Sequence, residues 1–250
     1  GAAGSLGANK AIVIDTTPAT VTDVTSPTAN GTYKLGDVVS VTVQFSEAVT
    51  VTGTPQLTLE TGTTDRTVNY AAGSGSNTLT FTYTVQAGDL TGDLDFTTTG
   101  ALALNGGTIR DAALNDATLT LAAPGAAGSL GANKAIAIDG VVPTVTNVTS
   151  PTANGTYKIG DVVDVTVQFS EAITVTGTPQ LLLETGTTDR QASYLSGTGS
   201  NTLTFRYTVA AGDVTGDLDF NGTGSLTLNG GTLQDPAGND AALTLPAPGA

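Results

Sequence analysis

Apolar and polar side chains alternate with a period of two over many short segments, which is typical of β-strands. The clearest case is Val38–Phe45 (VVSVTVQF), where one face is apolar and the other polar. Further candidate strands in the first half of the chain are Ala11–Asp15, Thr20–Thr25, Val49–Val51, Gln56–Glu60, Thr67–Tyr70, Thr78–Val85, Ala101–Leu104 and Thr118–Leu121. No segment shows a convincing helical period.

Turn-forming sequences such as SPTANG, TGTTD, GSGSN and NGG separate the candidate strands. The composition agrees, because threonine and valine favour strands and the 32 glycines suit tight turns. Many short strands at this spacing predict an all-β fold made of antiparallel β-sandwiches.

The chain repeats itself. GAAGSLGANKAI begins at Gly1 and again at Gly125, and TSPTANGTYK begins at Thr25 and again at Thr149, so the period is 124 residues without a gap. Roughly three positions in four are identical between the copies. A repeat of this length is a whole domain, so the sequence predicts two tandem domains.

Composition and charge exclude several classes of function. The chain has no cysteine and no histidine, so it has no disulfide, no thiolate or imidazole metal ligand and no Ser-His-Asp triad. With 22 acidic and 8 basic residues its net charge is −14. That charge argues against nucleic acid and anionic membranes and makes cations the natural partners. No apolar run approaches the roughly 20 residues of a membrane span, so we expect no membrane insertion of this segment.

The order of these segments resembles a known repeat type. It is carried by GTYKLGDVVSVTVQFSEAVTVTGTPQLTLETG, by NGGTIRDAALNDATLTL and by KAIVIDTTP. Together these are similar to the immunoglobulin-like and cadherin-like repeats of giant bacterial surface adhesins and biofilm proteins. The resemblance implies tandem immunoglobulin-like sandwiches outside the cell. Such arrays hold another part away from the surface and are often rigidified by calcium.

The repeat alone leaves two possible domain boundaries. A cut at PGAAGSLG makes residues 1–124 and 125–250 self-contained, whereas a cut at the proline-bearing linkers falls after Asp15 and Asp139. The resemblance favours the second, because KAIVID followed by TTP looks like a last strand entering a linker. The expected parts are then a closing strand with linker (1–17), a first sandwich (18–141) and a second sandwich without its own closing strand (142–250).

That boundary has a consequence for partners. Ala11–Asp15 would be the closing strand of a preceding repeat or of a neighbouring chain. A sandwich without an edge strand exposes unpaired backbone groups, and β-strand addition is one way to satisfy them. We therefore expect head-to-tail contacts between repeats, either within a longer covalent array or through Ala11–Asp15 of the next molecule.

The densest acidic cluster is AGDLTGDLDF, with its copy AGDVTGDLDF. Its acids are Asp89, Asp93 and Asp95 in the first repeat and Asp213, Asp217 and Asp219 in the second. Calcium takes six to eight oxygen ligands, and this spacing can supply several of them. We predict a calcium site at this turn, although repelling carboxylates are also relieved by wide exposure to solvent.

Glu47 and Glu171 follow a well-patterned strand at the same offset in VTVQFSEA. We predict that the strand ends there and delivers its carboxylate to the calcium site at the end of the sandwich. The alternative is that each glutamate is a solvated charge that caps an apolar strand.

The linker acids Asp15 and Asp139 are further candidate calcium ligands. Each precedes a proline-bearing linker, where an ion shared with the loops of a neighbouring domain would restrain the hinge, by analogy with cadherins. The turns DAALND (111–116) and DPAGND (235–240) are instead interpreted as hairpin turns stabilised by Asx turns.

These observations favour a structural protein over an enzyme. Paired carboxylates occur in glycosidases, but nothing marks one acid for a raised pKa, and aromatic residues are only 5% of the chain. We expect a calcium-stiffened stalk or head-to-tail filament on a bacterial surface. The alternatives are an adhesin module that recognises a glycan or matrix partner, and a component of a surface layer.

Overall fold

The computed structural model describes residues 4–249 and divides the chain into two compact units, Gly1–Asp139 and Gly140–Ala250. The large sheet of each unit is antiparallel, so the predicted all-β class with tandem sandwich domains is confirmed. The outermost residues of the expected parts 1–17 and 142–250, namely 1–3 and 250, lie outside the described residues.

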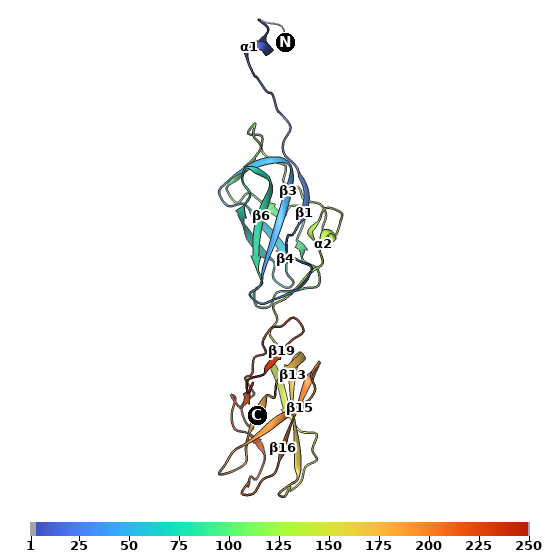
Figure 1. The fold of residues 1–250 in the computed structure, drawn as a ribbon, viewed down its shortest axis with the longest axis vertical. Helices are drawn as coiled ribbons and strands as arrows, with labels where there is room; N and C mark the ends of the chain where they lie inside the picture. Colours follow the sequence, from blue (N-terminus) through green and yellow to red (C-terminus); the bar gives the residue numbers. More distant parts are fainter. Residues whose placement is uncertain (1–3, 250) are drawn as a thin grey trace. The chain divides into compact units, whose positions relative to one another are not determined.

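Unit 1 holds one large and one small sheet. Figure 1 shows β1, β3, β4 and β6 of the large sheet. Its elements are α1 (Leu6–Asn9), β1 (Val21–Thr25), β2 (Gly31–Lys34), β3 (Val38–Thr52), β4 (Gln56–Glu60), β5 (Arg66–Ala72), β6 (Ser76–Thr84), β7 (Leu90–Thr91), β8 (Asp95–Phe96), β9 (Leu102–Ala103), β10 (Thr108–Arg110), α2 (Leu130–Asn133) and β11 (Ile136–Asp139). The large sheet has the order β1-β3-β6-β5-β4-β8, with β10 paired to β3 and β9 paired to β4.

Strand β3 corrects a prediction. We expected one strand to end at Glu47 and a second to begin at Val49, but a single strand of 15 residues runs through both. Its pairing with β6 shifts register between Gln44 and Val49, and its last residues pair with β10 instead. Glu47 therefore lies at an irregularity where the strand changes partners, and such bulges re-aim side chains.

Other short elements also differ from expectation. Thr118–Leu121 contributes only an isolated bridge between Thr118 and Thr20, and Ala11–Asp15 forms no strand. The pattern did not predict β2, β7, β8 or β10, which have only two to four residues each. The two four-residue helices were also missed, because they are single turns capped by Ser5 and Ser129.

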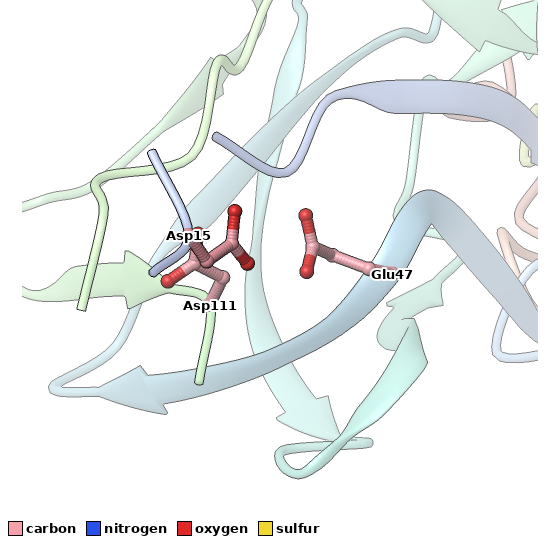
Figure 2. Close-up of side chains that lie close together, drawn as sticks. All are labelled: Asp15, Glu47 and Asp111. Carbon is pink, nitrogen blue, oxygen red and sulfur yellow. The ribbon is translucent and has the colours of Figure 1, made fainter. Parts of the chain in front are cut away.

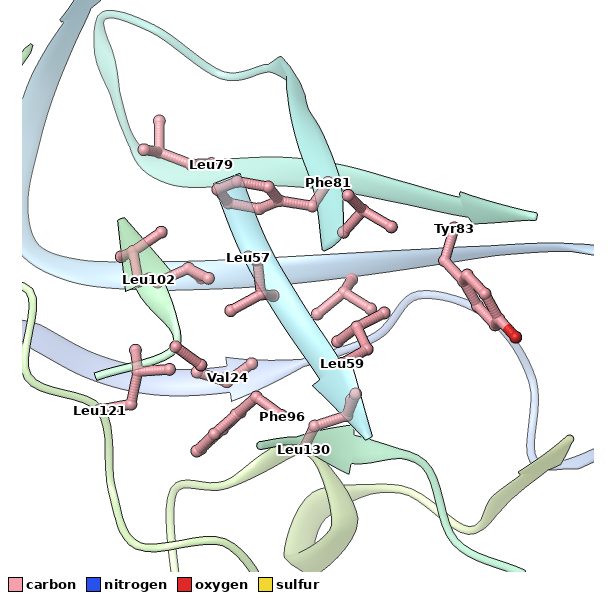
Figure 3. Close-up of a cluster of buried hydrophobic side chains, with 14 of the residues drawn as sticks. Val24, Leu57, Leu59, Leu79, Phe81, Tyr83, Phe96, Leu102, Leu121 and Leu130 are labelled. Carbon is pink, nitrogen blue, oxygen red and sulfur yellow. The ribbon is translucent and has the colours of Figure 1, made fainter. Parts of the chain in front are cut away.

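The core of unit 1 lies on the inner faces of these strands (Figure 3). Val39, Val41, Val43 and Phe45 alternate inward along β3 with at most 2% of their surface exposed. Phe81 of β6 is fully buried, as the alternation predicted. Burying a side chain of this size contributes about 1.5–3 kcal/mol, so the period-two pattern accounts for the position of the core.

The small sheet of unit 1 closes the domain. Its order is β2-β11-β7, with β11 parallel to β2 and antiparallel to β7. Leu130 of α2 and Ile136 and Ile138 of β11 are almost completely buried. The segment 125–139 therefore packs as part of unit 1.

Unit 2 repeats the large sheet. Its strands are β12 (Val145–Thr149), β13 (Val162–Thr176), β14 (Gln180–Glu184), β15 (Arg190–Ser196), β16 (Ser200–Thr208), β17 (Asp219–Phe220), β18 (Leu226–Thr227) and β19 (Thr232–Gln234). The order β12-β13-β16-β15-β14-β17 matches that of unit 1. Among residues 140–249 no small sheet forms, since residues 155–158 and 214–215, the counterparts of β2 and β7, are not strands.

Candidate cation site

Three carboxylates meet in unit 1: those of Asp15, Glu47 and Asp111 (Figure 2). One oxygen of each lies within 4.8 Å of an oxygen of each of the others. Asp15 comes from the segment before β1, Glu47 from the irregularity in β3 and Asp111 from the loop after β10. Asp15 is exposed, Glu47 is half-buried and Asp111 is buried. The fold thus joins acids that are far apart in sequence.

The turn after β10 holds Asp111 in place. Its Oδ1 accepts hydrogen bonds from the backbone N–H groups of Ala113 and Asn115, both at 2.9 Å, as expected for the predicted Asx-type turn. The Nδ2 of Asn115 donates to Oδ2 of Asp111 at 2.8 Å and to the carbonyl oxygen of Asp15 at 3.3 Å. Asn115 therefore ties the backbone of the linker to the turn that carries Asp111.

These hydrogen bonds keep Asp111 ionised. Burial by itself would raise the pKa of this carboxyl, but the side chain of Asn115 and the neighbouring backbone N–H groups lower the pKa below its ordinary value. The group is therefore negatively charged at neutral pH.

No arginine neutralises the negative charges of the three clustered carboxylates. All four arginines of the chain form ion pairs with other acids. Ca²⁺ binds oxygen at about 2.3–2.6 Å, so two of its ligands are at most about 5 Å apart. The separations among the three carboxylates fit that limit, and Asp15 and Glu47 are accessible enough for water to complete the coordination.

The structure gives Asp89 a different environment from the one we predicted. Its carboxylate is buried, pairs with Arg66 at 2.7 Å and accepts hydrogen bonds from the hydroxyl of Tyr83 at 2.6 Å and from the N–H of Gln86 at 3.0 Å. In unit 2, Asp213 pairs with Arg190 at 2.8 Å in the same arrangement. Both acids already have protein partners for their oxygens.

The other acids of that turn are also placed apart from Glu47. Asp95 accepts hydrogen bonds from the N–H of Phe96 at 2.8 Å and of Gly125 at 2.9 Å, and Asp219 accepts equivalent bonds from Phe220 and Gly249. Asp93 and Asp217 are exposed. Within residues 4–249, Glu47 is grouped with Asp15 and Asp111 rather than with Asp89, Asp93 and Asp95.

Unit 2 carries the equivalents of two of the three clustered acids. Glu171 matches Glu47 and is half-buried. Asp235 matches Asp111, is 2% exposed, and accepts hydrogen bonds at 2.8 Å from both the N–H and the Nδ2 of Asn239. Asp139, the match of Asp15 in the repeat, is the last residue of β11 in unit 1.

Our reading of the sequence missed Asp111 and Asp235 as candidate ligands. Their turns were explained by Asx hydrogen bonds, and the structure contains those bonds. The available signal was an acid at the first position of a turn, at the same offset in both copies. A carboxylate that accepts the hydrogen bonds of an Asx turn can still offer an oxygen to a cation. Only the pairing of β10 with β3 brings Asp111 close to Glu47.

The sequence matches no protein-family model and no curated protein. Each helix in residues 4–249 spans a single turn, far short of the length needed to cross a membrane. The candidate site therefore rests on its own geometry.

Proposed function

We propose that the chain is a structural repeat protein of the bacterial exterior, which forms a stalk or head-to-tail filament of β-sandwiches stiffened by calcium. The observation that carries the proposal is the proximity, within 4.8 Å, of the carboxylate of a linker acid, Asp15, to those of two acids of the sandwich, Glu47 and Asp111. The duplicated all-β sequence and its similarity to surface-adhesin repeats support the extracellular location.

The mechanism is mechanical. Residues 10–19 form no helix or strand, and the hydrogen bond from Asn115 to the carbonyl oxygen of Asp15 is one of the contacts that hold them to the domain. A divalent cation shared by Asp15, Glu47 and Asp111 would add a strong link between linker and sandwich and remove the repulsion among the carboxylates. Bending at the linker would then require breaking metal–ligand bonds.

Catalysis is not part of the proposal. Asp89 and Asp213 are each paired with an arginine and a tyrosine, and the chain contains no histidine or cysteine to act as base or nucleophile. Each unit has a packed hydrophobic core, as a mechanical role requires.

Calcium titration of the whole chain by calorimetry tests the proposal. We expect Asp15→Asn and Glu47→Gln each to lower the affinity of the unit 1 site about tenfold or more, because each removes one of three carboxylate ligands. Asp93→Asn is the matched control, since Asp93 is an exposed acid outside the cluster, and it should bind as the parent does. Equal affinities in all three variants would reject the site.

Stiffening is measured separately by small-angle X-ray scattering in millimolar calcium and in EDTA. We expect calcium to narrow the distribution of overall dimensions in the parent chain and to have no such effect in Asp15→Asn. Calcium binding without any change in that distribution would reject the stiffening role while leaving the site intact.

A further inference from the structure

Unit 2 contains a groove of about 660 Å³. Its apolar lining includes Val148, Tyr157, Val163, Val165, Leu218 and Phe220. Of the counterparts in unit 1, Val24, Val39, Val41, Leu94 and Phe96 are fully buried. In unit 2, Val163 and Val165 are each 7% exposed and Phe220 is 8% exposed, while Val148 and Leu218 are only half-buried. The same core positions are thus less covered in unit 2.

In unit 1 the segment 125–139 covers these positions. The carbonyl oxygen of Ile136 accepts a hydrogen bond from the N–H of Leu94 at 2.7 Å, and that of Gly128 accepts one from Val24 at 3.0 Å. The Nδ2 of Asn133 donates to the carbonyl oxygen of Val24 at 2.9 Å. These bonds accompany the burial of three apolar side chains, those of Leu130, Ile136 and Ile138.

The chain of unit 2 follows the same path up to the groove. Gly249 N–H donates to Oδ2 of Asp219 at 2.8 Å, just as Gly125 N–H donates to Oδ2 of Asp95 at 2.9 Å. What covers the groove in unit 1 is therefore the stretch after Gly125. The occupant that fits the groove of unit 2 has the sequence and shape of that stretch.

Residues 1–15 have that sequence. They differ from residues 125–139 only at Val13, which replaces Ala137, a residue at a half-buried position. Their helix α1 (Figure 1) has the same bounds and the same serine cap as α2, with Ser5 Oγ accepting from the N–H of Ala8 at 3.3 Å.

The apolar side chains of this segment are uncovered in the described structure. Leu6 is 69% exposed, Ile12 is 65% exposed and Ile14 is 85% exposed, whereas their counterparts in unit 1 are at most 1% exposed. Covering one such side chain contributes about 1.5–3 kcal/mol. The segment therefore has the sequence and the uncovered apolar side chains that the groove of unit 2 requires.

We propose that residues 1–15 of one copy insert into the groove of unit 2 of a second copy and take the place that β11 has in unit 1. This inference rests on the proposed head-to-tail assembly and names its partner segment. Residues 12–15 pair in parallel with residues 155–158, as β11 pairs with β2, so Val13 lies opposite Thr156. Residues 14 and 15 pair antiparallel with residues 214 and 215, as β11 pairs with β7.

The register has a chemical consequence at Asn9. Its counterpart Asn133 donates from Nδ2 to Oδ1 of Asp23 at 2.6 Å. In unit 2 the residue matching Asp23 is Asn147, whose amide oxygen can accept the same hydrogen bond. Donor and acceptor surfaces differ, so the contact is heterologous and one copy can follow another without closing a ring.

Light-scattering mass of the whole chain as a function of concentration tests the assembly. We expect the parent to grow to species of several chain masses. The double variant Ile12→Asp, Ile14→Asp should remain a monomer, and Val13→Ala, which makes the segment identical to residues 125–139, should still assemble. The substituted isoleucines are exposed, so both units should fold, which circular dichroism verifies.

A second variant supplies, within the same chain, a segment that fills the groove. Adding AGSLGANKAIAID, the sequence of residues 127–139, after Ala250 should fill the groove and abolish growth. A parent that stays monomeric at all concentrations overturns the proposal, including the case in which its own residues 1–15 fold back. A variant that assembles despite the added segment also overturns it.

Disulfide formation tests the register, because the chain has no natural cysteine. Neighbouring Cα atoms of paired strands are about 5 Å apart, which suits a disulfide. Val13→Cys with Thr156→Cys should crosslink different copies on mild oxidation, and Val13→Cys with Gln191→Cys, on an exposed site of β15, should not. Equal crosslinking of both pairs would overturn the register. Calcium binding by unit 1 is measured on a monomer, so failure of strand insertion and failure of the calcium proposal are distinguishable.

Discussion

The two repeats contain the same tetrapeptide, GTYK, in different conformations. In unit 1 it is strand β2 (Gly31–Lys34), and in unit 2 residues 155–158 form no strand. The difference between the units is β11, which pairs with β2 along its whole length. A strand of four residues does not form from its own propensity but from a partner that satisfies its backbone groups.

The same comparison holds for a buried polar group. The hydroxyl of Tyr83 donates to Asp89, and that of Tyr207 donates to Asp213, with an arginine beside each carboxylate. Burial, followed by the hydrogen bond to the carboxylate, raises the pKa of Tyr207 to about 12. Burial also raises the pKa of Tyr83, which is fully buried where Tyr207 is 5% exposed. The hydrogen bond between Tyr207 and Asp213 in unit 2 is therefore less shielded from water than that between Tyr83 and Asp89 in unit 1.

The largest expected difference between the repeats concerns the closing segment. Ile136→Ala removes a fully buried side chain and should destabilise unit 1 by about 2–5 kcal/mol. Ile12→Ala, the matched change on the exposed segment, should leave the stability of unit 1 unchanged in dilute solution. Hydrogen exchange read by mass spectrometry resolves each unit. Equal losses of protection would show that residues 1–15 already pack on the monomer.

A smaller difference is expected at the buried ion pairs. Asp89→Asn leaves Arg66 without its charge partner and should destabilise unit 1 by about 3 kcal/mol. Asp213→Asn should cost less in unit 2, because Arg190 is 34% exposed where Arg66 is 23% exposed. Urea denaturation followed by tyrosine fluorescence measures both. A larger effect at Asp213 would contradict the view that the groove admits water beside it.

The smallest expected effect is the pH dependence that the Asp164–Arg206 ion pair gives to the stability of unit 2. The hydrogen bonds from Arg206 lower the pKa of Asp164, and Ser40 and Thr82 stand at these positions in unit 1. A lowered folded pKa means that the pair's contribution is present above the unfolded pKa, about 3.9. It is lost as the pH falls below that value. Replacing the pair by Ser and Thr (Asp164→Ser, Arg206→Thr) should reduce the loss of unfolding free energy that unit 2 shows at acid pH. Urea denaturation at a series of pH values measures it. If the loss of stability at acid pH is the same in this variant, it comes from other carboxylates.

Local patterns in the sequence were enough for the fold class and much of the core. Alternation along Val38–Phe45 predicts which side chains lie inward, because successive residues of a strand face opposite sides of the sheet. Turn residues mark where strands stop, and duplication implies two domains. These features depend on neighbours only a few residues away.

The candidate site and the groove depend on contacts across long stretches of chain, so sequence patterns could only suggest parts of them. We expected Glu47 to join the acids of the AGDLTGDLDF turn, Asp15 to bind at a linker and Asp111 to form an Asx turn. Only strand pairing and the turn after β10 bring the oxygens of these three residues together. Likewise GANKAI reads the same at residues 7–12 and 131–136, yet one copy is exposed and the other includes a buried Ile136. Burial is decided by which surface a segment meets, and that partner is absent from the segment's own sequence.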